Sequence, residues 1–339
     1  MTKTMIIAEL SGNHNQDLQY TKDSMYAIKE TGADAVKLQT YTADALTLNV
    51  DNDEFGPRQS GLWQGQTPYD VFTRGALPYA WHAELFAYAK SLDLLCFSTP
   101  FDQAGLMLLE SVDNPIYKVA SFEIKHVPLL EQLAATGKPI IISTGIATLA
   151  DIEQALGYFP NKSNITLLKC TSAYPAPYDQ IDLKSMVSLQ HMFGVKVGVS
   201  DHTLGAVVPI AAVALGASMI EKHFILDRTA GGIDVDFSMD AYEFTDMVKQ
   251  VRITEQVLGE RRYQLSPSAL SARQRGRKIY IKENVKSGDT VTPDNIAIVR
   301  GQYGLEPLHY QAVLGQEFKT RAHAGDGLEW HMLNDERCI

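Results

Sequence analysis

The sequence predicts an α/β fold, a (β/α)8 (TIM) barrel followed by a small β-rich domain, and two observations lead to it. Through the first 258 residues, short β-rich runs that end in polar residues alternate with amphipathic segments of helical period. Eight such units match the length and pattern of a (β/α)8 barrel, with a doubly wound sheet as the alternative. Beyond Gly259 the composition changes to a polar linker and then to short β-like runs broken by turn signals.

Apolar runs with polar ends locate the eight expected strands. They are MIIAEL, AVKLQT, LLCFSTP, IYKVAS, PIIISTG, ITLLKCTS, VKVGVSDH and MIEKHF. Helices are expected near 17–31, 81–92, 102–112, 127–136, 149–157, 182–192 and 242–258, with an Ala-rich helix between the last two strands. Residues 41–79 form an irregular stretch far longer than a typical connection, so we expect it to cover a site.

The chain is expected to divide into three parts. These are a barrel domain over residues 1–258, a linker over 259–274 and a β-rich domain over 275–339. The last part carries a faint repeat, because KSGDTVTPDNI resembles HAGDGLEWHML after 37 residues. Two similar halves predict a small pseudo-symmetric module.

Composition excludes several classes of protein. With 45% hydrophobic residues and a net charge of −10, the 339-residue chain lacks the clustered basic charge of nucleic-acid and membrane-surface binders. No run of 18 apolar residues and no signal-peptide core occur, so we expect a cytoplasmic protein. Cys96, Cys170 and Cys338 show no CxxC spacing, which predicts buried free thiols rather than disulfides or a zinc site.

Two histidines follow the last two predicted strands. The stretch from Gly198 to Phe224 reads as a strand ending in Ser200, Asp201 and His202, a helix, and a strand ending in His223. Because the carboxyl ends of neighbouring parallel strands open onto one face, His202 and His223 can meet there. Two imidazoles that meet suit a divalent metal ion.

Other chemically active residues end the remaining strands on the same face. They are Glu9, Lys37, Thr99, Lys118, Ser121, Glu123, Ser143, Ser172, Tyr174, Ser200 and Glu221. Lysines on apolar strands are costly to bury without an anion, so two lysines beside several hydroxyls predict a pocket for a small molecule with a carboxylate and a phosphate. The structural alternative is that Glu9 and Glu123 pair with these lysines. Thr148 and Asp151 are expected only to cap a helix.

Eight ordered motifs resemble the sialic acid synthase family of phosphoenolpyruvate-dependent nonulosonic acid synthases. They are IIAELSGNH, VKLQTY, CFSTPF, YKVASFE, STGIAT, LKCTSAYP, GVSDHT and EKHF. The C-terminal part resembles the family's antifreeze-like (SAF) domain. ASFE, SAYP, TYTADALTLN and GLW are similar to the branch that makes pseudaminic acid, which implies 2,4-diacetamido-2,4,6-trideoxy-L-altrose as the acceptor sugar.

The resemblance implies a role for each matching residue. His202 and His223 match ligands of a divalent ion, Mn²⁺ first, with Mg²⁺ or Co²⁺ as alternatives. Lys37 and Thr99 match contacts to the phosphoenolpyruvate carboxylate. Lys118, Ser121, Ser143 and Ser200 match contacts to its phosphate. Ser172 stands at a further phosphate-contact position, where the sialic acid branch has Asn. Acceptor or acid/base positions match Glu9, Tyr174, Glu221 and Asp234, with Glu123 nearby.

Arg300 matches an arginine that the SAF domain delivers into the barrel of a partner subunit, which implies a homodimer. Gly301 replaces the usual proline after it, so we expect that loop to be less stiff.

The implied activity is a metal-dependent, transferase-type condensation of phosphoenolpyruvate with the acceptor, in which a C–O bond of phosphoenolpyruvate breaks and phosphate leaves. Two alternatives stay open. One is the same chemistry on a legionaminic or N-acetylneuraminic acid precursor, and the other is a non-catalytic sugar-binding barrel. Residues 39–49, 61–69 and Ala173 are expected to decide which acceptor fits, since an apolar wall suits a methyl at C6.

Overall fold

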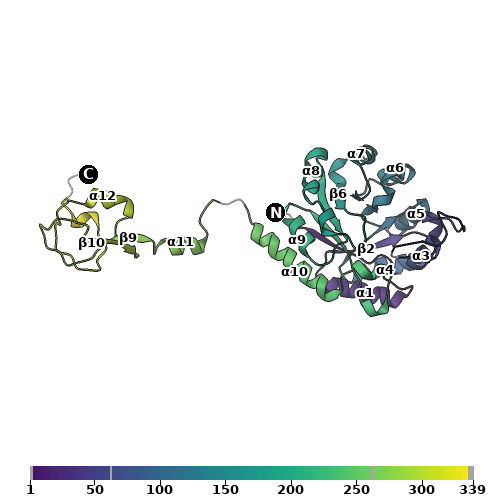
Figure 1. Ribbon diagram of the computed structural model, residues 1–339, viewed down its shortest axis with the longest axis horizontal. Helices are drawn as coiled ribbons and strands as arrows, with labels where there is room; N and C mark the ends of the chain where they lie inside the picture. The colour runs from purple at the N-terminus through teal and green to yellow at the C-terminus, as the bar shows by residue number, and fades with distance from the viewer. Residues whose placement is uncertain (1–2, 62, 261–262, 335–339) are drawn as a thin grey trace. The chain divides into compact units, whose positions relative to one another are not determined.

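The computed structural model describes residues 3–61, 63–260 and 263–334. The chain divides into two compact units, Met1–Gly259 and Glu260–Ile339 (Figure 1). Each unit has its own hydrophobic core. No helix in the described part of the chain is long and apolar enough to cross a membrane.

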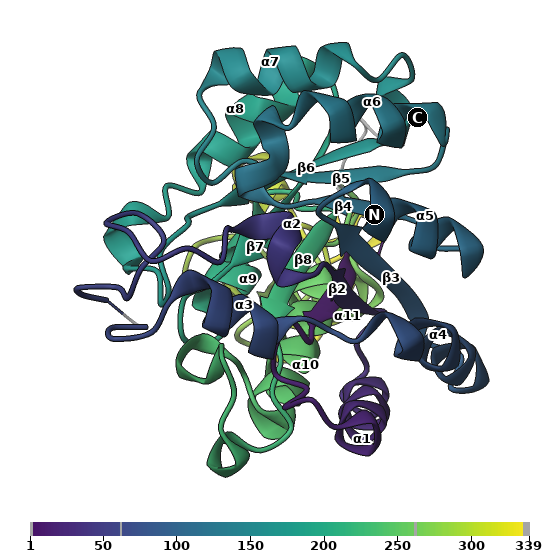
Figure 2. The same cartoon turned by 90° about the vertical axis from the view of Figure 1, so that its right-hand side faces the viewer.

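The first unit is a closed barrel of eight parallel strands with helices around it (Figure 2). The strands are β1 (Met5–Glu9), β2 (Ala35–Thr40), β3 (Leu95–Pro100), β4 (Tyr117–Val119), β5 (Ile140–Ser143), β6 (Ile165–Cys170), β7 (Lys196–Asp201) and β8 (Met219–His223). Each pairs with the next in sequence, and β1 also pairs with β8, where Glu9 lies opposite His223. The barrel prediction is therefore confirmed and the doubly wound alternative is wrong.

Helices follow the strands as the sequence predicts. They are α1 (Leu18–Glu30), α4 (His82–Ser91), α5 (Gln103–Ser111), α6 (Val127–Ala135), α7 (Leu149–Gly157), α8 (Lys184–Phe193), α9 (Val207–Ala214) and α10 (Ala241–Leu258). Single 3₁₀ turns are η1 (Tyr79–Trp81), η2 (Ser121–Lys125), η3 (Lys162–Asn164), η4 (Tyr178–Gln180), η5 (Arg228–Ala230) and η6 (Val235–Phe237). Thr148 and Asp151 form a capping box at α7, so their prediction as capping residues is confirmed.

The stretch 41–79 is less irregular than the sequence predicts. It contains α2 (Ala43–Leu46) and α3 (Pro68–Gly75). Thr67 caps α3 by accepting from the Asp70 N–H at 3.1 Å, and Pro68 occupies the first helical position. Tyr41, at the start of the stretch, packs edge-on against Phe72 in α3 and against Phe101 after β3.

Alternation along the strands separates an apolar floor from a polar site inside the barrel. The inward residues Ile7, Ala35, Phe97, Ile141 and Leu168 pack together as the floor. Two positions further along each of four of these strands come Glu9, Lys37, Thr99 and Ser143. Since side chains two apart share a strand face, the same strands that close the barrel present the polar residues above the floor. Their outward faces pack against the helices.

The second unit is a small β module. An antiparallel pair, β9 (Arg277–Ile281) and β10 (Ile296–Arg300), is accompanied by α11 (Pro267–Arg273), α12 (Tyr310–Val313), η7 (Pro307–His309) and η8 (Trp330–Met332). Helix α11 lies within the segment predicted to be a linker, where Ser266 caps it. The predicted repeat is visible in two equivalent turns, because Lys286 N–H donates to Asp289 at 2.7 Å and His323 N–H donates to Asp326 at 2.8 Å.

Candidate active site

Four charged side chains meet inside the barrel above the floor, and we name Glu9, Lys37, Lys118 and Glu221 the mouth cluster. All four are buried, with at most 4% of each residue exposed. Lys37 forms an ion pair with Glu9 and lies 3.6 Å from Glu221 Oε2, while Lys118 lies 3.1 Å from Glu221 Oε1. The structural alternative from the sequence named Glu9 and Glu123 as partners of the two lysines. Glu9 does pair with Lys37, but the partner of Lys118 is Glu221, because the closed barrel brings β8 across to β4.

Electrostatics distinguish the two carboxylates of the cluster. Burial alone would raise the pKa of Glu221, but the charges of Lys118 and Lys37 outweigh burial and lower it to about 2. Burial raises the pKa of Glu9 against the opposing charge of Lys37. Glu221 therefore stays ionised near neutral pH, and Glu9 is the carboxylate that takes a proton more readily.

Serine hydroxyls border the small space that the missing side chain of Gly145 leaves just after β5. Ser143 Oγ and Ser172 Oγ are buried and have no hydrogen-bond partner. A Cβ on Gly145 would lie 2.2 Å from Ser172 Oγ and 2.9 Å from Ser121 Oγ, so only glycine leaves this space free. Buried hydroxyls without partners cost free energy, and a bound oxyanion would satisfy them.

The remaining predicted hydroxyls contact the mouth cluster directly. Ser200 Oγ donates to Glu221 Oε1 at 3.0 Å. Lys37 Nζ donates to Thr99 Oγ1 at 3.4 Å. Gln39, two positions after Lys37 on β2, donates to Glu9 Oε1 at 2.9 Å. Sequence analysis named Gln39 only as part of an acceptor-facing segment, although its spacing from Lys37 places both on the inward face.

The two histidines lie side by side at the ends of β7 and β8. Their ring centroids are 5.3 Å apart, and both residues are buried. His202 Nδ1 lies 3.0 Å from the Thr171 carbonyl oxygen, an arrangement that fixes the ring and leaves Nε2 for a ligand. His223 Nδ1 is buried without a hydrogen-bond partner. Burial lowers the pKa of His223 well below its usual value, which favours the neutral ring that a metal needs. For His202 burial acts in the same direction, but the hydrogen bond and charge of Cys170 outweigh burial and raise the pKa.

This donor set fits a divalent ion held by few protein ligands. Among the described residues, no group of three or more His, Cys, Asp or Glu could bind a metal. The chain would supply the two imidazoles, and water or substrate would supply the other ligands.

Cys170 is a buried free thiol, as the sequence predicts, and its Sγ lies 3.9 Å from His202 Nδ1. Cys96 is likewise buried and free, while Cys338 lies outside the described residues.

Aromatic rings line the site next to the histidines. The Tyr174 ring lies 4.4 Å from the His202 ring, and the Phe237 ring lies 4.9 Å from the His223 ring. Tyr174 and Phe237 are 5.1 Å apart. Sequence reasoning found Tyr174 but missed Phe237, because the loop after β8 gives no pattern that predicts which of its residues turn inward.

Asp234 lies against His223 and is held by the loop after β1. Its Oδ2 is 3.7 Å from His223 Nδ1 and accepts a hydrogen bond from Ser11 Oγ. Asn13 accepts from the Asp234 N–H at 3.2 Å and donates to the Phe224 carbonyl oxygen at 2.9 Å. Burial raises the pKa of Asp234. Ser11 and Asn13 were missed, although the SGN run directly after the first strand is the signal that could have found them.

Glu123 lies apart from the mouth cluster. It stands in η2, and no ion pair joins it to Lys118 in the described structure. Its Oε2 is buried without a hydrogen-bond partner, and burial raises the pKa of Glu123 to about 7.

Arg300 ends β10 in the second unit, with an exposed side chain. Its place relative to any barrel stays a prediction. The loop after Arg300 lacks the proline but is held by close packing and by hydrogen bonds. A Cβ on Gly301 would lie 2.0 Å from Tyr280 Oη, and the Tyr303 N–H donates to that oxygen at 3.2 Å. Gly301 N–H also donates to the Gly276 carbonyl oxygen at 3.0 Å, a bond that proline would lack.

Comparisons with known proteins agree with this geometry. Residues 24–263 match the NeuB family and residues 276–334 match the SAF domain. A pseudaminic acid synthase of Helicobacter pylori is 46% identical over 315 residues, covering 92% of each chain. An N,N'-diacetyllegionaminic acid synthase of Legionella pneumophila is 36% identical, covering 97% of this chain and 94% of its own. The crystal structure of an N-acetylneuraminic acid synthetase from Leptospira borgpetersenii in complex with citrate superposes with a TM-score of 0.72 at 29% identity, covering 80% of this chain and 91% of its own.

Proposed function

The chain belongs to the NeuB family, and we propose that it is a pseudaminic acid synthase. It would condense phosphoenolpyruvate with 2,4-diacetamido-2,4,6-trideoxy-L-altrose to give pseudaminic acid and phosphate. The higher identity to the Helicobacter enzyme than to the Legionella enzyme supports this acceptor. The observation that carries the activity is the set of buried hydroxyls without partners beside two buried lysines.

Phosphoenolpyruvate binding follows from the charges and the free hydroxyls. Lys37 and Thr99 take the carboxylate, and Lys118 takes the phosphate. The phosphate oxygens accept hydrogen bonds from the hydroxyls of Ser121, Ser143, Ser172 and Ser200. Lys37 is paired with Glu9 and Glu221, and Lys118 is paired with Glu221, so the ligand replaces part of that pairing instead of meeting bare charge. The burial of the cluster keeps water out and strengthens each of these contacts.

His202 and His223 would hold a divalent ion, Mn²⁺ first, with Mg²⁺ or Co²⁺ as alternatives. When bound, the ion supplies Lewis acidity that orients and polarises the acceptor aldehyde. The chain's own residues prepare this position. The Thr171 carbonyl oxygen orients His202, and Asp234 lies beside His223, where it can accept a hydrogen bond from an acceptor hydroxyl.

The reaction then needs one new C–C bond and one water. C3 of phosphoenolpyruvate adds to the aldehyde carbon, which turns the aldehyde oxygen into an alkoxide and leaves cationic character at C2. Of the two protons of the attacking water, one ends on this alkoxide and the other leaves with phosphate. Water gives a proton to a carboxylate of the pair Glu9 and Glu221 and attacks C2. The tetrahedral adduct expels inorganic phosphate by cleavage of the C2–O bond, and Lys118 with the serine hydroxyls stabilises the departing dianion. Tyr174 and Phe237 form the wall that keeps the reacting carbons from bulk water.

A homodimer completes the proposal, with the SAF domain of one subunit capping the barrel of the other through Arg300. The separate core of the second unit and its tethering through a polar segment support an independent cap. Arg300→Ala is expected to impair use of the acceptor more than binding of phosphoenolpyruvate. An unchanged acceptor KM and kcat would refute this part.

A mass-resolved assay tests the activity. Phosphoenolpyruvate and Mn²⁺ are offered with the diacetamido altrose sugar, the corresponding diacetamido mannose or N-acetylmannosamine in separate reactions, each with and without EDTA. Turnover confined to the altrose sugar and abolished by EDTA is expected. Turnover of another acceptor would favour the legionaminic or N-acetylneuraminic alternative. No turnover of any sugar would favour a sugar-binding barrel.

A further inference from the structure

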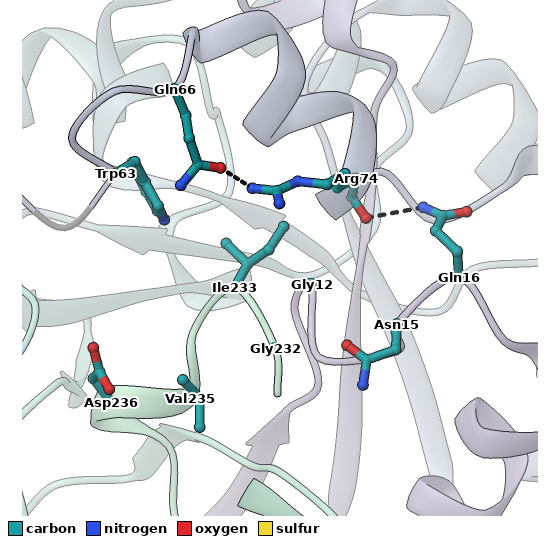
Figure 3. Close-up of a pocket in the computed structure, with 10 residues that line it drawn as sticks. All are labelled: Gly12, Asn15, Gln16, Trp63, Gln66, Arg74, Gly232, Ile233, Val235 and Asp236. Carbon is teal, nitrogen blue, oxygen red and sulfur yellow. Dashed lines mark hydrogen bonds between the residues drawn. The ribbon is translucent and has the colours of Figure 1, made fainter. Parts of the chain in front are cut away.

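An open pocket of about 460 Å³ lies among three loops of the barrel unit (Figure 3). Such a volume falls within the range of small-molecule sites. The loop after β1, the segment between β2 and β3, and the loop after β8 all contribute to it. Its lining residues are Gly12, Asn15, Gln16, Trp63, Gln66, Arg74, Gly232, Ile233, Val235 and Asp236.

The pocket adjoins the candidate active site through Asp234. Ile233 and Val235 line the pocket on either side of Asp234 in the chain, and Gly12 follows Ser11, which donates to the Asp234 carboxylate. Asp234 Oδ2 in turn lies 3.7 Å from His223 Nδ1. The segment from Ile233 to Val235 therefore separates the histidines from the pocket and borders both.

Close packing holds the three loops together at the edge of the pocket. A Cβ on Gly75 would lie 2.7 Å from Tyr41 Oη and 2.9 Å from Ile233 Cδ1. A Cβ on Gly12 would lie 3.3 Å from the Gly75 Cα. The pocket wall is therefore built by tight contact between loops and is formed before a ligand arrives.

The lining combines one cation with an apolar wall. The Arg74 guanidinium donates to Gln66 Oε1, and its other donors make no hydrogen bond among the described residues. Gln16 Nε2 donates to the Arg74 carbonyl oxygen at 3.0 Å, which ties this residue to the loop after β1. Trp63 and Ile233 supply apolar surface around the same space (Figure 3).

We infer that this pocket selects the acceptor by the end remote from its aldehyde, with Arg74 donating to the carbonyl oxygen of the 4-acetamido group and the Trp63 and Ile233 wall taking the C6 methyl. The inference rests on the proposed function and goes beyond it by naming the groups that are recognised. An amide carbonyl needs a donor when it leaves water, and a methyl gains from an apolar wall. Asp236 also lines the pocket, where its carboxylate can accept a hydrogen bond from a hydroxyl or amide N–H of the same sugar.

A thermodynamic cycle that combines a substitution of Arg74 with a change of substrate tests the role of this residue. Arg74→Met and the wild type are assayed with the altrose sugar and with its analogue that carries a 4-hydroxyl in place of the 4-acetamido group. We expect Arg74→Met to lower kcat/KM by about tenfold or more with the parent sugar and by less than about twofold with the analogue. The KM for phosphoenolpyruvate should not change. Arg58→Met, in the same segment with an exposed side chain outside the pocket lining, should behave as wild type. Equal losses with both sugars would overturn the inference.

A second cycle tests the apolar wall. Trp63→Ala is assayed with the altrose sugar and with its 6-hydroxy analogue, and the preference for the methyl should fall by about fivefold or more. An unchanged preference would overturn this half of the inference. A wild type that turns over only another acceptor would instead sink the proposed function, and the pocket assignment with it. If the wild type is active on the altrose sugar, but in both cycles the effect of the substitution is the same with either substrate, then the pocket assignment alone is contradicted.

Discussion

Two buried charge clusters lie back to back in this barrel, and their hydrogen bonds differ. Behind the mouth cluster, Lys222 donates to Asp201 Oδ2 at 2.6 Å and to the Thr203 carbonyl oxygen at 2.5 Å. Asp201 also accepts from the Thr203 N–H at 3.0 Å and from Thr203 Oγ1 at 3.1 Å. We name Lys222 and Asp201 the outer pair, and each of its charges is fully enclosed and hydrogen-bonded.

The mouth cluster leaves polar atoms unsatisfied at its border. Glu221 Oε2, Ser143 Oγ, Ser172 Oγ and His223 Nδ1 are buried without a hydrogen-bond partner. Glu221 and Lys222 are neighbours on β8, so their side chains point to opposite faces of the same strand. Buried charges whose hydrogen bonds are all made within the protein indicate a structural role. Buried polar groups that lack a hydrogen-bond partner indicate a binding site for a ligand.

The largest expected effect separates the clusters by activity. Lys118→Met should lower kcat/KM for phosphoenolpyruvate by about a thousandfold, because it removes the cation that would meet the phosphate. The melting temperature should fall less than in Lys222→Met, since Lys37 still pairs with both carboxylates. Lys125→Met is the matched control, because its side chain is 66% exposed. Full activity of Lys118→Met would remove the distinction between the two clusters.

The outer pair should control stability. Lys222→Met leaves Asp201 buried without its partner and should lower the free energy of unfolding by about 3–5 kcal/mol, measured by urea denaturation. Lys138→Met, which removes a more exposed ion pair with Glu110, should cost less than about 1 kcal/mol. If Lys222→Met lowers the free energy of unfolding no more than Lys138→Met does, the outer pair does not stabilise the fold in the way proposed.

Gly145 offers a smaller and more local test. In Gly145→Ala the new methyl would enter the space between Ser172 Oγ and Ser121 Oγ and should raise the KM for phosphoenolpyruvate by about tenfold. Gly157→Ala is the control, because a Cβ there meets nothing within 4 Å. Unchanged kinetics of Gly145→Ala would mean that the hydroxyls do not surround the phosphate.

The last comparison concerns Glu123, which lies outside both clusters, and its dependence on pH. Because burial raises the pKa of Glu123 to about 7, the folded protein holds this proton more tightly than the unfolded chain, whose carboxyl has a pKa near 4.5. Stability from this group is present below pH 4.5 and is lost as the pH rises through about 7. The stability of Glu123→Gln relative to wild type should therefore be about 2 kcal/mol higher at pH 8 than at pH 5. Parallel stability curves for the two proteins over this range would contradict the assignment.

Sequence reasoning could predict the barrel and most of the site because both follow from strand periodicity. Polar residues at strand ends, such as Lys37 and His202, must share one face once the strands are parallel. Ion pairing across the barrel could not be predicted, since it depends on closure, and so Glu221 was not named as a partner of either lysine. Residues in the long loops were also missed, as Phe237 shows, because no period tells which loop side chains turn inward.

The central claim is that the unpartnered serine hydroxyls bind phosphoenolpyruvate. Isothermal titration calorimetry tests it most directly, by titrating phosphoenolpyruvate into the wild type and into the double variant Ser143→Ala/Ser172→Ala. Both hydroxyls are buried without partners, so their removal should leave the melting temperature unchanged or raise it. The account predicts one site per chain in the wild type and an affinity at least about tenfold weaker in the variant. Equal affinity in the two proteins would contradict the claim that these unsatisfied groups form the phosphoenolpyruvate site.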